Sequence, residues 1–133
     1  MLFVIHIKID IYRLSRYDTL LYNYYKLTTM PSAIIVEDEV LASERLRVLL
    51  EECQVVLLKT FHHAQPALDW LSVHEVDIVF ADIGLPEMNG LEFVERIKRV
   101  AKKQPHVIFT TAYEEHALRA FELAAADYLL KPI

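Results

Sequence analysis

The sequence predicts an α/β fold, a doubly wound five-stranded parallel sheet with helices on both faces. Two observations predict it: five short apolar runs lack the polar alternation of a half-exposed strand, and segments with helical periodicity separate these runs. Uninterrupted apolar runs are typical of strands that are covered on both faces. Because strands and helices alternate along the chain, right-handed crossovers would place them in a single parallel sheet.

The expected strands span residues 33–36, 55–60, 77–81, 106–110 and 127–130, and the expected helices span 40–52, 64–74, 90–102 and 115–124. In the first helix, Leu46, Leu49, Leu50 and Cys53 recur at the spacing of one helical face. The chain stops at Ile133, directly after the last expected strand.

Length and composition restrict the class of protein. A chain of 133 residues fits one domain, and 54% apolar with 25% charged residues argues against wholesale disorder. The net charge of −5 argues against a nucleic-acid-binding surface, which needs a basic patch. The single Cys53 cannot form an intramolecular disulfide, and no apolar run approaches the roughly 18 residues of a membrane span, so we expect a cytoplasmic protein without membrane contact.

A change in composition near Met30 divides the chain. Residues 1–29 contain no Ala, Gly or Glu and carry four Lys or Arg against two Asp, which leaves a net charge of −7 for residues 30–133. We therefore expect an N-terminal extension over residues 1–30 and the folded domain over residues 31–133. Two interpretations of the extension stay open: an ordered segment, or residues upstream of a natural start at Met30. We favour the second, because the residues with candidate chemistry begin within a few positions of Met30.

The polar residues that follow the expected strands predict the location of the site. In open parallel sheets, ligands bind outside the carboxyl ends of the strands, near the point where the strand order reverses. The residues at these ends are Glu37 to Glu39, Asp82, Thr110 with Thr111, and Lys131. All of the candidate chemistry therefore falls on one edge of the sheet.

The acidic residues at this edge allow two interpretations. Glu37, Asp38 and Asp82 offer oxygen ligands without a neighbouring His or Cys set, which is the chemistry of a hard cation such as Mg²⁺. Alternatively, Glu37 to Glu39 form an acidic start to the helix that follows, where negative charge is favourable. The run alone favours the helix start, and for Glu39 we keep that interpretation.

Lys131 favours the first interpretation because it places a cation directly after a buried strand and before a proline. Thr111 adds a hydroxyl at the end of the preceding strand, and the small Ala112 leaves its backbone amide approachable. A metal, an ammonium group, a hydroxyl and an amide around one aspartate are suited to binding a phosphoryl group during its transfer.

These motifs, taken together, resemble those of a known family. Glu37 with Asp38, the string DIGLPEMNG from Asp82 to Gly90, Thr111 with Ala112, and Lys131 before a proline resemble the receiver domain of two-component response regulators. The string IFTTAYEEHALRAFELAAADYLLKPI is similar to the LytTR-type (LytR/AlgR-like) branch. The resemblance covers residues 33–133 and implies the flavodoxin-like receiver fold, in which a fifth helix normally follows the fifth strand.

The resemblance also implies a role for each matching residue. Asp82 would be the phosphoacceptor. Asp38 and Asp82 would ligate Mg²⁺, with Glu37 helping through water and Gly84 through its carbonyl. Thr111, the Ala112 amide and Lys131 would bind the phosphoryl oxygens, and Thr111 with Tyr128 would form the conformational switch.

The expected function is that of a signal-transduction phosphoprotein: a sensor histidine kinase phosphorylates Asp82, and the change controls an output domain. In LytTR-type relatives this output is a C-terminal DNA-binding domain for transcription regulation, which the chain lacks, so we expect no direct DNA binding. A homodimer is one way to cover the sheet where the fifth helix is missing. Two alternatives stay open: a small aspartate-nucleophile phosphohydrolase, which Gly84 disfavours by replacing a second catalytic aspartate, and a phosphate-independent interaction module.

Overall fold

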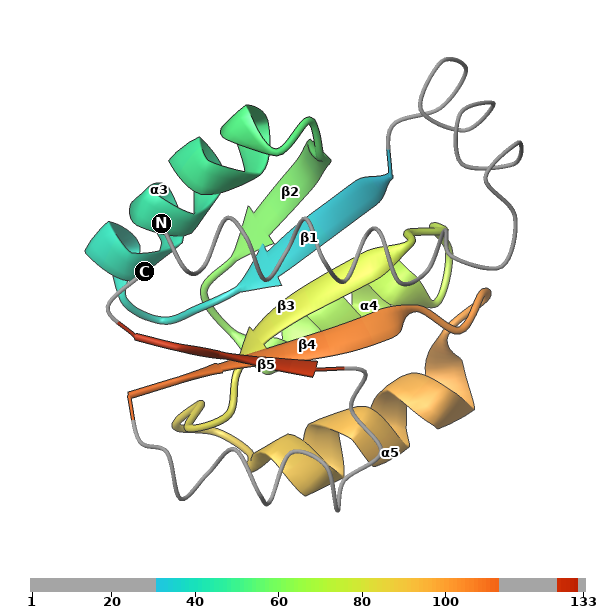
Figure 1. The fold of residues 1–133 in the computed structure, drawn as a ribbon. Coiled ribbons are helices and arrows are strands. Elements are labelled where there is room, and N and C mark those ends of the chain that lie inside the picture. The colour runs from blue at the N-terminus through green and yellow to red at the C-terminus, as the bar shows by residue number, and fades with distance from the viewer. Residues whose placement is uncertain (1–30, 113–126, 132–133) are drawn as a thin grey trace.

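The computed structural model describes residues 31–112 and 127–131, and element labels follow Figure 1. The elements along the chain are β1 (Ser32–Val36), α3 (Val40–Glu52), β2 (Val56–Phe61), α4 (Ala64–Leu71), β3 (Ile78–Asp82), α5 (Gly90–Val100), β4 (His106–Thr111) and β5 (Asp127–Leu130). Each described element lies within a few residues of its predicted range. The expected helix at 115–124 and the expected extension at 1–30 lie outside the described residues.

The five strands form one parallel sheet in the order β2-β1-β3-β4-β5. This order confirms the predicted doubly wound architecture, because the chain moves from β1 outward to β2 and then returns past β1 to β3. The strand order reverses at β1 and β3, so the carboxyl ends of these two strands mark the expected position of a site.

Two helices end earlier than predicted, α4 at Leu71 and α5 at Val100. After α4, the amide of Val73 donates three residues back to the carbonyl of Trp70 (3.2 Å), which closes the helix in a tighter turn. After α5, Ala101 adopts extended backbone, and the amide of Lys102 donates to the carbonyl of Leu71 (3.0 Å). The periodicity of the sequence does not reveal these hydrogen bonds, so it could not predict where the two helices end.

Apolar side chains cover the sheet on both faces. Ile34 and Val36 belong to the core that packs under α4 and α5, whereas Ala33 and Ile35 belong to the core under α3. Figure 1 shows α4 behind the strands. Burial on both faces explains why these strands show no polar alternation.

The single Trp70 of the sequence lies in α4, between two rings. Its indole stacks on the imidazole of His74 with a centroid distance of 4.5 Å, and it meets the ring of Phe61 edge-on at 6.1 Å. Phe61 is the last residue of β2, and its carbonyl accepts a hydrogen bond from the amide of Glu37 (2.9 Å). Trp70 is thus two contacts away from the end of β1.

A polar cluster ties the amino-terminal ends of the central strands together. The Oδ2 atom of Asp77 accepts hydrogen bonds from the amide (2.9 Å) and the hydroxyl (3.2 Å) of Ser32, and its Oδ1 atom accepts from Nζ of Lys103 (2.8 Å). Burial acts to raise the pKa of Asp77, but these hydrogen bonds outweigh it and hold the pKa below its usual range. The cluster joins the start of β1, the residue before β3 and the chain after α5.

Within residues 31–112 and 127–131, every helix falls short of the length and apolar character that a membrane-crossing helix needs.

Candidate functional site

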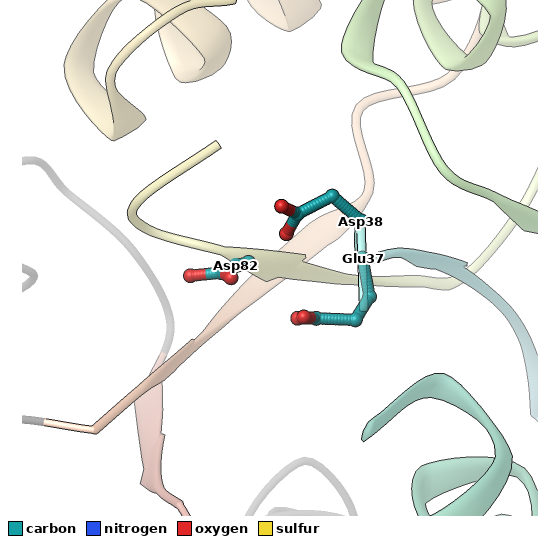
Figure 2. Close-up of side chains that lie close together, drawn as sticks. All are labelled: Glu37, Asp38 and Asp82. Atoms are coloured by element: carbon teal, nitrogen blue, oxygen red, sulfur yellow. The ribbon is translucent and has the colours of Figure 1, made fainter. Parts of the chain in front are cut away.

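The carboxylates of Glu37, Asp38 and Asp82 meet at the carboxyl ends of β1 and β3 (Figure 2). The parallel register pairs Val36 with Ala81, so the residues that follow them on the two strands are neighbours. One carboxylate oxygen of each acidic residue lies within 4.8 Å of the other two. Glu37 is buried, Asp82 is half-buried and Asp38 is exposed, so solvent reaches the cluster from the Asp38 side.

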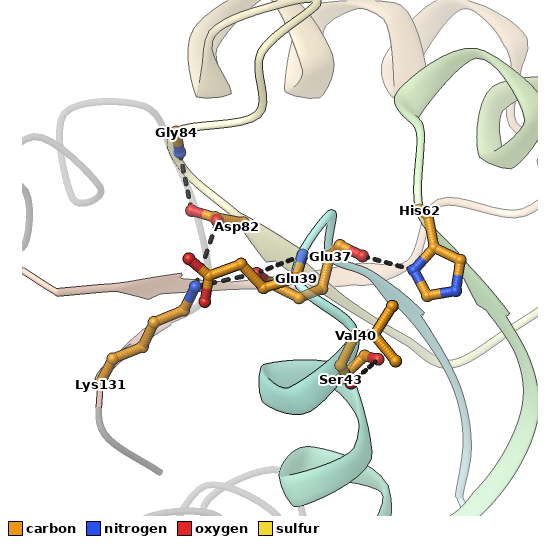
Figure 3. Close-up of polar contacts among 8 residues, drawn as sticks. All are labelled: Glu37, Glu39, Val40, Ser43, His62, Asp82, Gly84 and Lys131. Carbon is orange, nitrogen blue, oxygen red and sulfur yellow. Dashed lines mark hydrogen bonds and ion pairs between the residues drawn. The ribbon is translucent and has the colours of Figure 1, made fainter.

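Lys131 supplies the positive charge for this cluster. Its Nζ atom lies 3.0 Å from Oε1 of Glu37 and 3.2 Å from Oδ2 of Asp82 (Figure 3). Two like charges about 4 Å apart repel by about 4 kcal/mol at an effective dielectric constant of about 20, so the ammonium group offsets a large part of the repulsion. The amide of Lys131 donates to the carbonyl of Thr111 (2.6 Å), which fixes the residue at the end of β5 beside β4.

The helix-start alternative does not account for Glu37. Glu39 is the N-cap residue of α3 and makes no side-chain capping hydrogen bond. The Oε1 atom of Glu37 accepts from the Glu39 amide (3.3 Å) and from Lys131, so the Glu37 carboxylate belongs to the acidic cluster. Among the described residues, Glu37 is the one buried carboxylate.

Both oxygens of Asp82 have a hydrogen-bond donor. Oδ2 accepts from Lys131, and Oδ1 accepts from the amide of Gly84 (2.9 Å) (Figure 3). This contact uses the amide of Gly84, whereas the role predicted for this residue concerns its carbonyl. The two donors orient the Asp82 carboxylate at the mouth of the site.

The remaining predicted residues lie on β4 and β5. Thr111 is the last residue of β4 and is buried, and Ala112 directly after it is exposed. Tyr128 is half-buried, pairs in register with Phe109, and packs against the core under α4 and α5. The structure therefore brings Glu37, Asp38, Asp82 and Lys131 together. The functional roles of Thr111, Ala112, Gly84 and Tyr128 stay predictions.

Comparison with protein families matches residues 33–133 to the response regulator receiver domain. The chain belongs to this family. Transcriptional regulatory protein YpdB of Escherichia coli strain K12 is 43% identical over 100 residues, covering 74% of this chain and 41% of that protein. Sensory transduction protein LytT of Bacillus anthracis is 40% identical over 104 residues, covering 77% of this chain and 42% of that protein.

Solved structures agree with these sequence comparisons. The response regulatory domain of MrkE from Klebsiella pneumoniae matches with a TM-score of 0.67 and 39% identity, over 77% of this chain and 84% of that one. The receiver fold and the LytTR-type resemblance are thus confirmed. The chain spans less than half the length of YpdB and LytT.

The pKa values of Glu37 and Lys131 are both raised in this receiver domain. Burial is the cause for Glu37, whereas for Lys131 neighbouring negative groups outweigh burial. Burial raises the pKa of Glu37, and the negative charge of Asp82 adds to this, although the hydrogen bond from Lys131 opposes it. Burial acts to lower the pKa of Lys131, but the hydrogen bond to Glu37 and the charge of Asp82 outweigh it and raise the pKa. Lys131 therefore stays positively charged at neutral pH, and the cost of burial falls on Glu37.

Two residues near the site of this receiver were not singled out from the sequence. His62 is exposed, and its Nδ1 atom lies 2.9 Å from the carbonyl oxygen of Glu37 (Figure 3). Glu87 lies in the loop between β3 and α5, and its carboxylate contacts the start of α4. The strand-end rule could have found His62, because it directly follows β2 and β2 pairs with β1. No sequence signal pointed to the Glu87 contact.

Proposed function

We propose that this receiver domain accepts a phosphoryl group on Asp82, with Mg²⁺ as cofactor, and that this modification switches the output of a longer regulatory protein. One observation carries the proposal: three carboxylates converge beside Lys131 at the edge where the strand order reverses. The phosphoryl donor would be a phosphohistidine on a sensor histidine kinase.

The donor set fits a hard cation. The three carboxylate oxygens lie within 4.8 Å of one another and offer the all-oxygen ligands that Mg²⁺ takes in proteins. Asp38 and Asp82 would hold the ion directly, Glu37 would hold it through water, and Gly84 would contribute its carbonyl. When bound, the ion neutralises charge on the phosphoryl oxygens.

The residues of the chain would carry the transfer as follows. An oxygen of Asp82 forms a bond to phosphorus while the bond from phosphorus to the imidazole nitrogen breaks, and the bonding electron pair stays on that nitrogen. The product is an acyl phosphate on Asp82, and the released imidazole takes up a proton from solvent to become a neutral histidine on the donor. Lys131 moves from pairing two carboxylates to pairing a phosphoryl oxygen, and the Thr111 hydroxyl and Ala112 amide donate to the others.

Exposed apolar residues beside the cluster support the approach of a protein donor. Val40 and Leu41, at the start of α3, are 62% and 74% exposed. They directly follow the acidic run and leave an apolar surface next to the solvent-facing Asp38. A histidine kinase domain that covers this surface would exclude water as it presents its phosphohistidine.

The switch would use Thr111 and Tyr128. Movement of Thr111 toward the phosphoryl group would free space beside β4, and Tyr128 on β5 would turn inward. The changed surface would control a LytTR-type DNA-binding domain elsewhere in the full protein, and through it transcription. The names of YpdB and LytT, a transcriptional regulatory and a sensory transduction protein, support this output.

Incubation with acetyl phosphate and Mg²⁺, followed by mass spectrometry of the intact chain, tests the proposal. We expect a stable adduct of about 80 Da, one phosphoryl group, which a chelator and the substitution Asp82→Asn both abolish. Asp69→Asn is the matched control, because Asp69 is an exposed aspartate on α4 and should leave the adduct intact.

The same experiment separates the alternatives. Rapid turnover of acetyl phosphate without an adduct would identify a phosphohydrolase. A chain that neither forms the adduct nor consumes acetyl phosphate would be a phosphate-independent interaction module.

A further inference from the structure

Glu87 lies between β3 and α5, and its side chain contacts the start of α4. Its Oε1 atom accepts a hydrogen bond from the amide of Ala64 (2.5 Å) and lies 3.7 Å from Nδ1 of His63. The N-cap residue of α4 is His63, which makes no side-chain capping hydrogen bond, and the first turn of α4 contains no acidic residue. A carboxylate from a distant part of the chain thus accepts from the first amide of α4, one of the amides that have no partner within the helix.

Glu87 belongs to the loop between β3 and α5, which begins directly after Asp82 and carries Gly84. At its start, the loop is held by the hydrogen bonds from Gly84 to Asp82 (2.9 Å) and from the Ile83 amide to the Thr110 carbonyl (3.0 Å). At its end, the Asn89 side chain caps α5. Between these points, among the described residues, the polar contact that ties the loop to another element is that of Glu87 with the start of α4.

The loop that receives Glu87 is also tied to the acidic cluster from its other side. Nδ1 of His62 lies 2.9 Å from the carbonyl oxygen of Glu37, and the Glu37 amide donates to the carbonyl of Phe61 (2.9 Å). The loops after β1, β2 and β3 are therefore linked in series from Glu37 through His62 and Ala64 to Glu87. These contacts therefore connect the end of β1, which carries Glu37, with the loop that follows Asp82 at the end of β3.

We propose that Glu87 is a positioning residue for the site: its carboxylate docks the β3–α5 loop on the start of α4 and thereby holds Gly84 and Asp82 in the geometry that binds Mg²⁺. The inference rests on the proposed function. A charge-assisted hydrogen bond to a helix amide is stronger than a neutral one, and the positive end of the helix dipole favours the ionised carboxylate. Loss of this tether leaves the loop with the hydrogen bonds at its two ends and with the packing of Leu85 and Met88 in the core.

The test compares Glu87→Ala and Glu87→Gln with the unchanged chain by calorimetric titration with Mg²⁺ and by the rate of adduct formation with acetyl phosphate. We expect Glu87→Ala to raise the Mg²⁺ dissociation constant about tenfold, as is usual when outer-shell support of a metal site is lost. Glu87→Gln keeps an oxygen that accepts from the Ala64 amide and should recover most of the affinity. Glu75→Gln, which removes an equal charge at an exposed position, should leave the constant unchanged.

A double variant separates positioning from simple helix capping. Adding His63→Ser to Glu87→Ala supplies α4 with a local cap, so the unfolding temperature should recover, whereas the Mg²⁺ dissociation constant should stay raised because the loop remains untethered.

Wild-type Mg²⁺ affinity and phosphorylation rate in Glu87→Ala would overturn the positioning role and leave the proposed function standing. Recovery of both quantities by His63→Ser would also overturn it, because capping alone would then explain the effect. If the unchanged chain itself binds no Mg²⁺ and forms no adduct, the proposed function fails and the positioning role fails with it.

Discussion

At the scale of single residues, Glu37 carries the largest electrostatic cost in the site. Its carboxylate is buried beside Asp82, and the hydrogen bond from Lys131 does not fully offset the burial, so the pKa of Glu37 lies above its usual range. A group whose pKa is higher in the folded than in the unfolded chain favours folding while it is protonated. Its contribution is lost as the pH rises through the folded pKa.

We therefore predict that Glu37→Gln stabilises the chain at neutral pH without Mg²⁺. The amide keeps an oxygen that accepts from Lys131 but removes the buried negative charge. The gain should shrink as the pH falls toward about 4.3, the usual pKa of a glutamate, because Glu37 in the unchanged chain then becomes neutral. Urea unfolding at pH 7 and pH 4 measures both values, and an equal or lower stability of the variant at pH 7 would contradict the argument.

At the scale of elements, the end of α3 contains a residue with an unfavourable backbone conformation. Gln54, just after α3, has φ of 60°, in the left-handed region that favours glycine. The amides of Gln54 and Val55 donate back to the carbonyls of Glu51 (3.1 Å) and Leu50 (2.9 Å), which hold this conformation in place.

Gln54→Gly should stabilise the chain by about 0.5 kcal/mol. The left-handed conformation costs an ordinary residue about 1–2 kcal/mol, part of which the greater freedom of glycine in the unfolded chain cancels. Arg45→Gly, at an exposed position inside α3, is the opposite control and should cost about 1 kcal/mol. Thermal unfolding that shows both glycines to be equally destabilising would refute the strain at Gln54.

The start of α5 gives a second prediction about an element. A Cβ atom at Gly90 would lie 2.9 Å from Cγ1 of Ile83 and 3.1 Å from ring carbons of Phe109, so Gly90→Ala should destabilise the chain by about 1–3 kcal/mol. At Gly84 the nearest atom would be Oδ1 of Asp82 at 3.6 Å, an ordinary contact. In denaturant unfolding, Gly84→Ala should therefore stay near the unchanged chain, and a comparable loss there would count against the steric explanation.

Sequence reasoning predicted the strands well because each one is an apolar run between polar ends, and the register of a parallel sheet then places Glu37 beside Asp82. It predicted the helix ends less well. The stop of α5 depends on a hydrogen bond from Lys102 to Leu71. The start of α4 was predicted correctly at residue 64, but the contact of its first amide with Glu87 was not predicted. Both contacts join segments that are distant in sequence, and neither leaves a periodic pattern.

At the scale of the whole molecule, the two ends of the sheet carry different kinds of polar cluster. The carboxyl ends of the strands hold the acidic cluster, whose excess of negative charge fits a cation. The amino-terminal ends hold Asp77 with Ser32 and Lys103, in which the carboxylate has donors on both oxygens. The first cluster is suited to binding and the second to stability.

Asp77→Asn should accordingly lower the stability of the whole domain by about 1 kcal/mol at pH 7, because the pairing is partly exposed and screened by solvent. The pKa of Asp77 is lowered by folding, so its contribution is present above about pH 3.9 and is lost as the pH falls through the folded pKa. Acid unfolding curves of the two chains should converge at the lowest pH. A constant difference at all pH values would rule out the charge as the cause.

The position of Trp70 has a practical consequence. An indole that stacks on His74 and touches Phe61 has an emission that depends on both neighbours, and Phe61 shares a hydrogen bond with the residue that opens the acidic run. Addition of MgCl₂ should change this emission in the unchanged chain, and the change should disappear in Asp38→Asn. Trp70 would then report occupancy of the acidic cluster in real time without an attached dye, and an emission that MgCl₂ leaves unchanged would contradict this coupling.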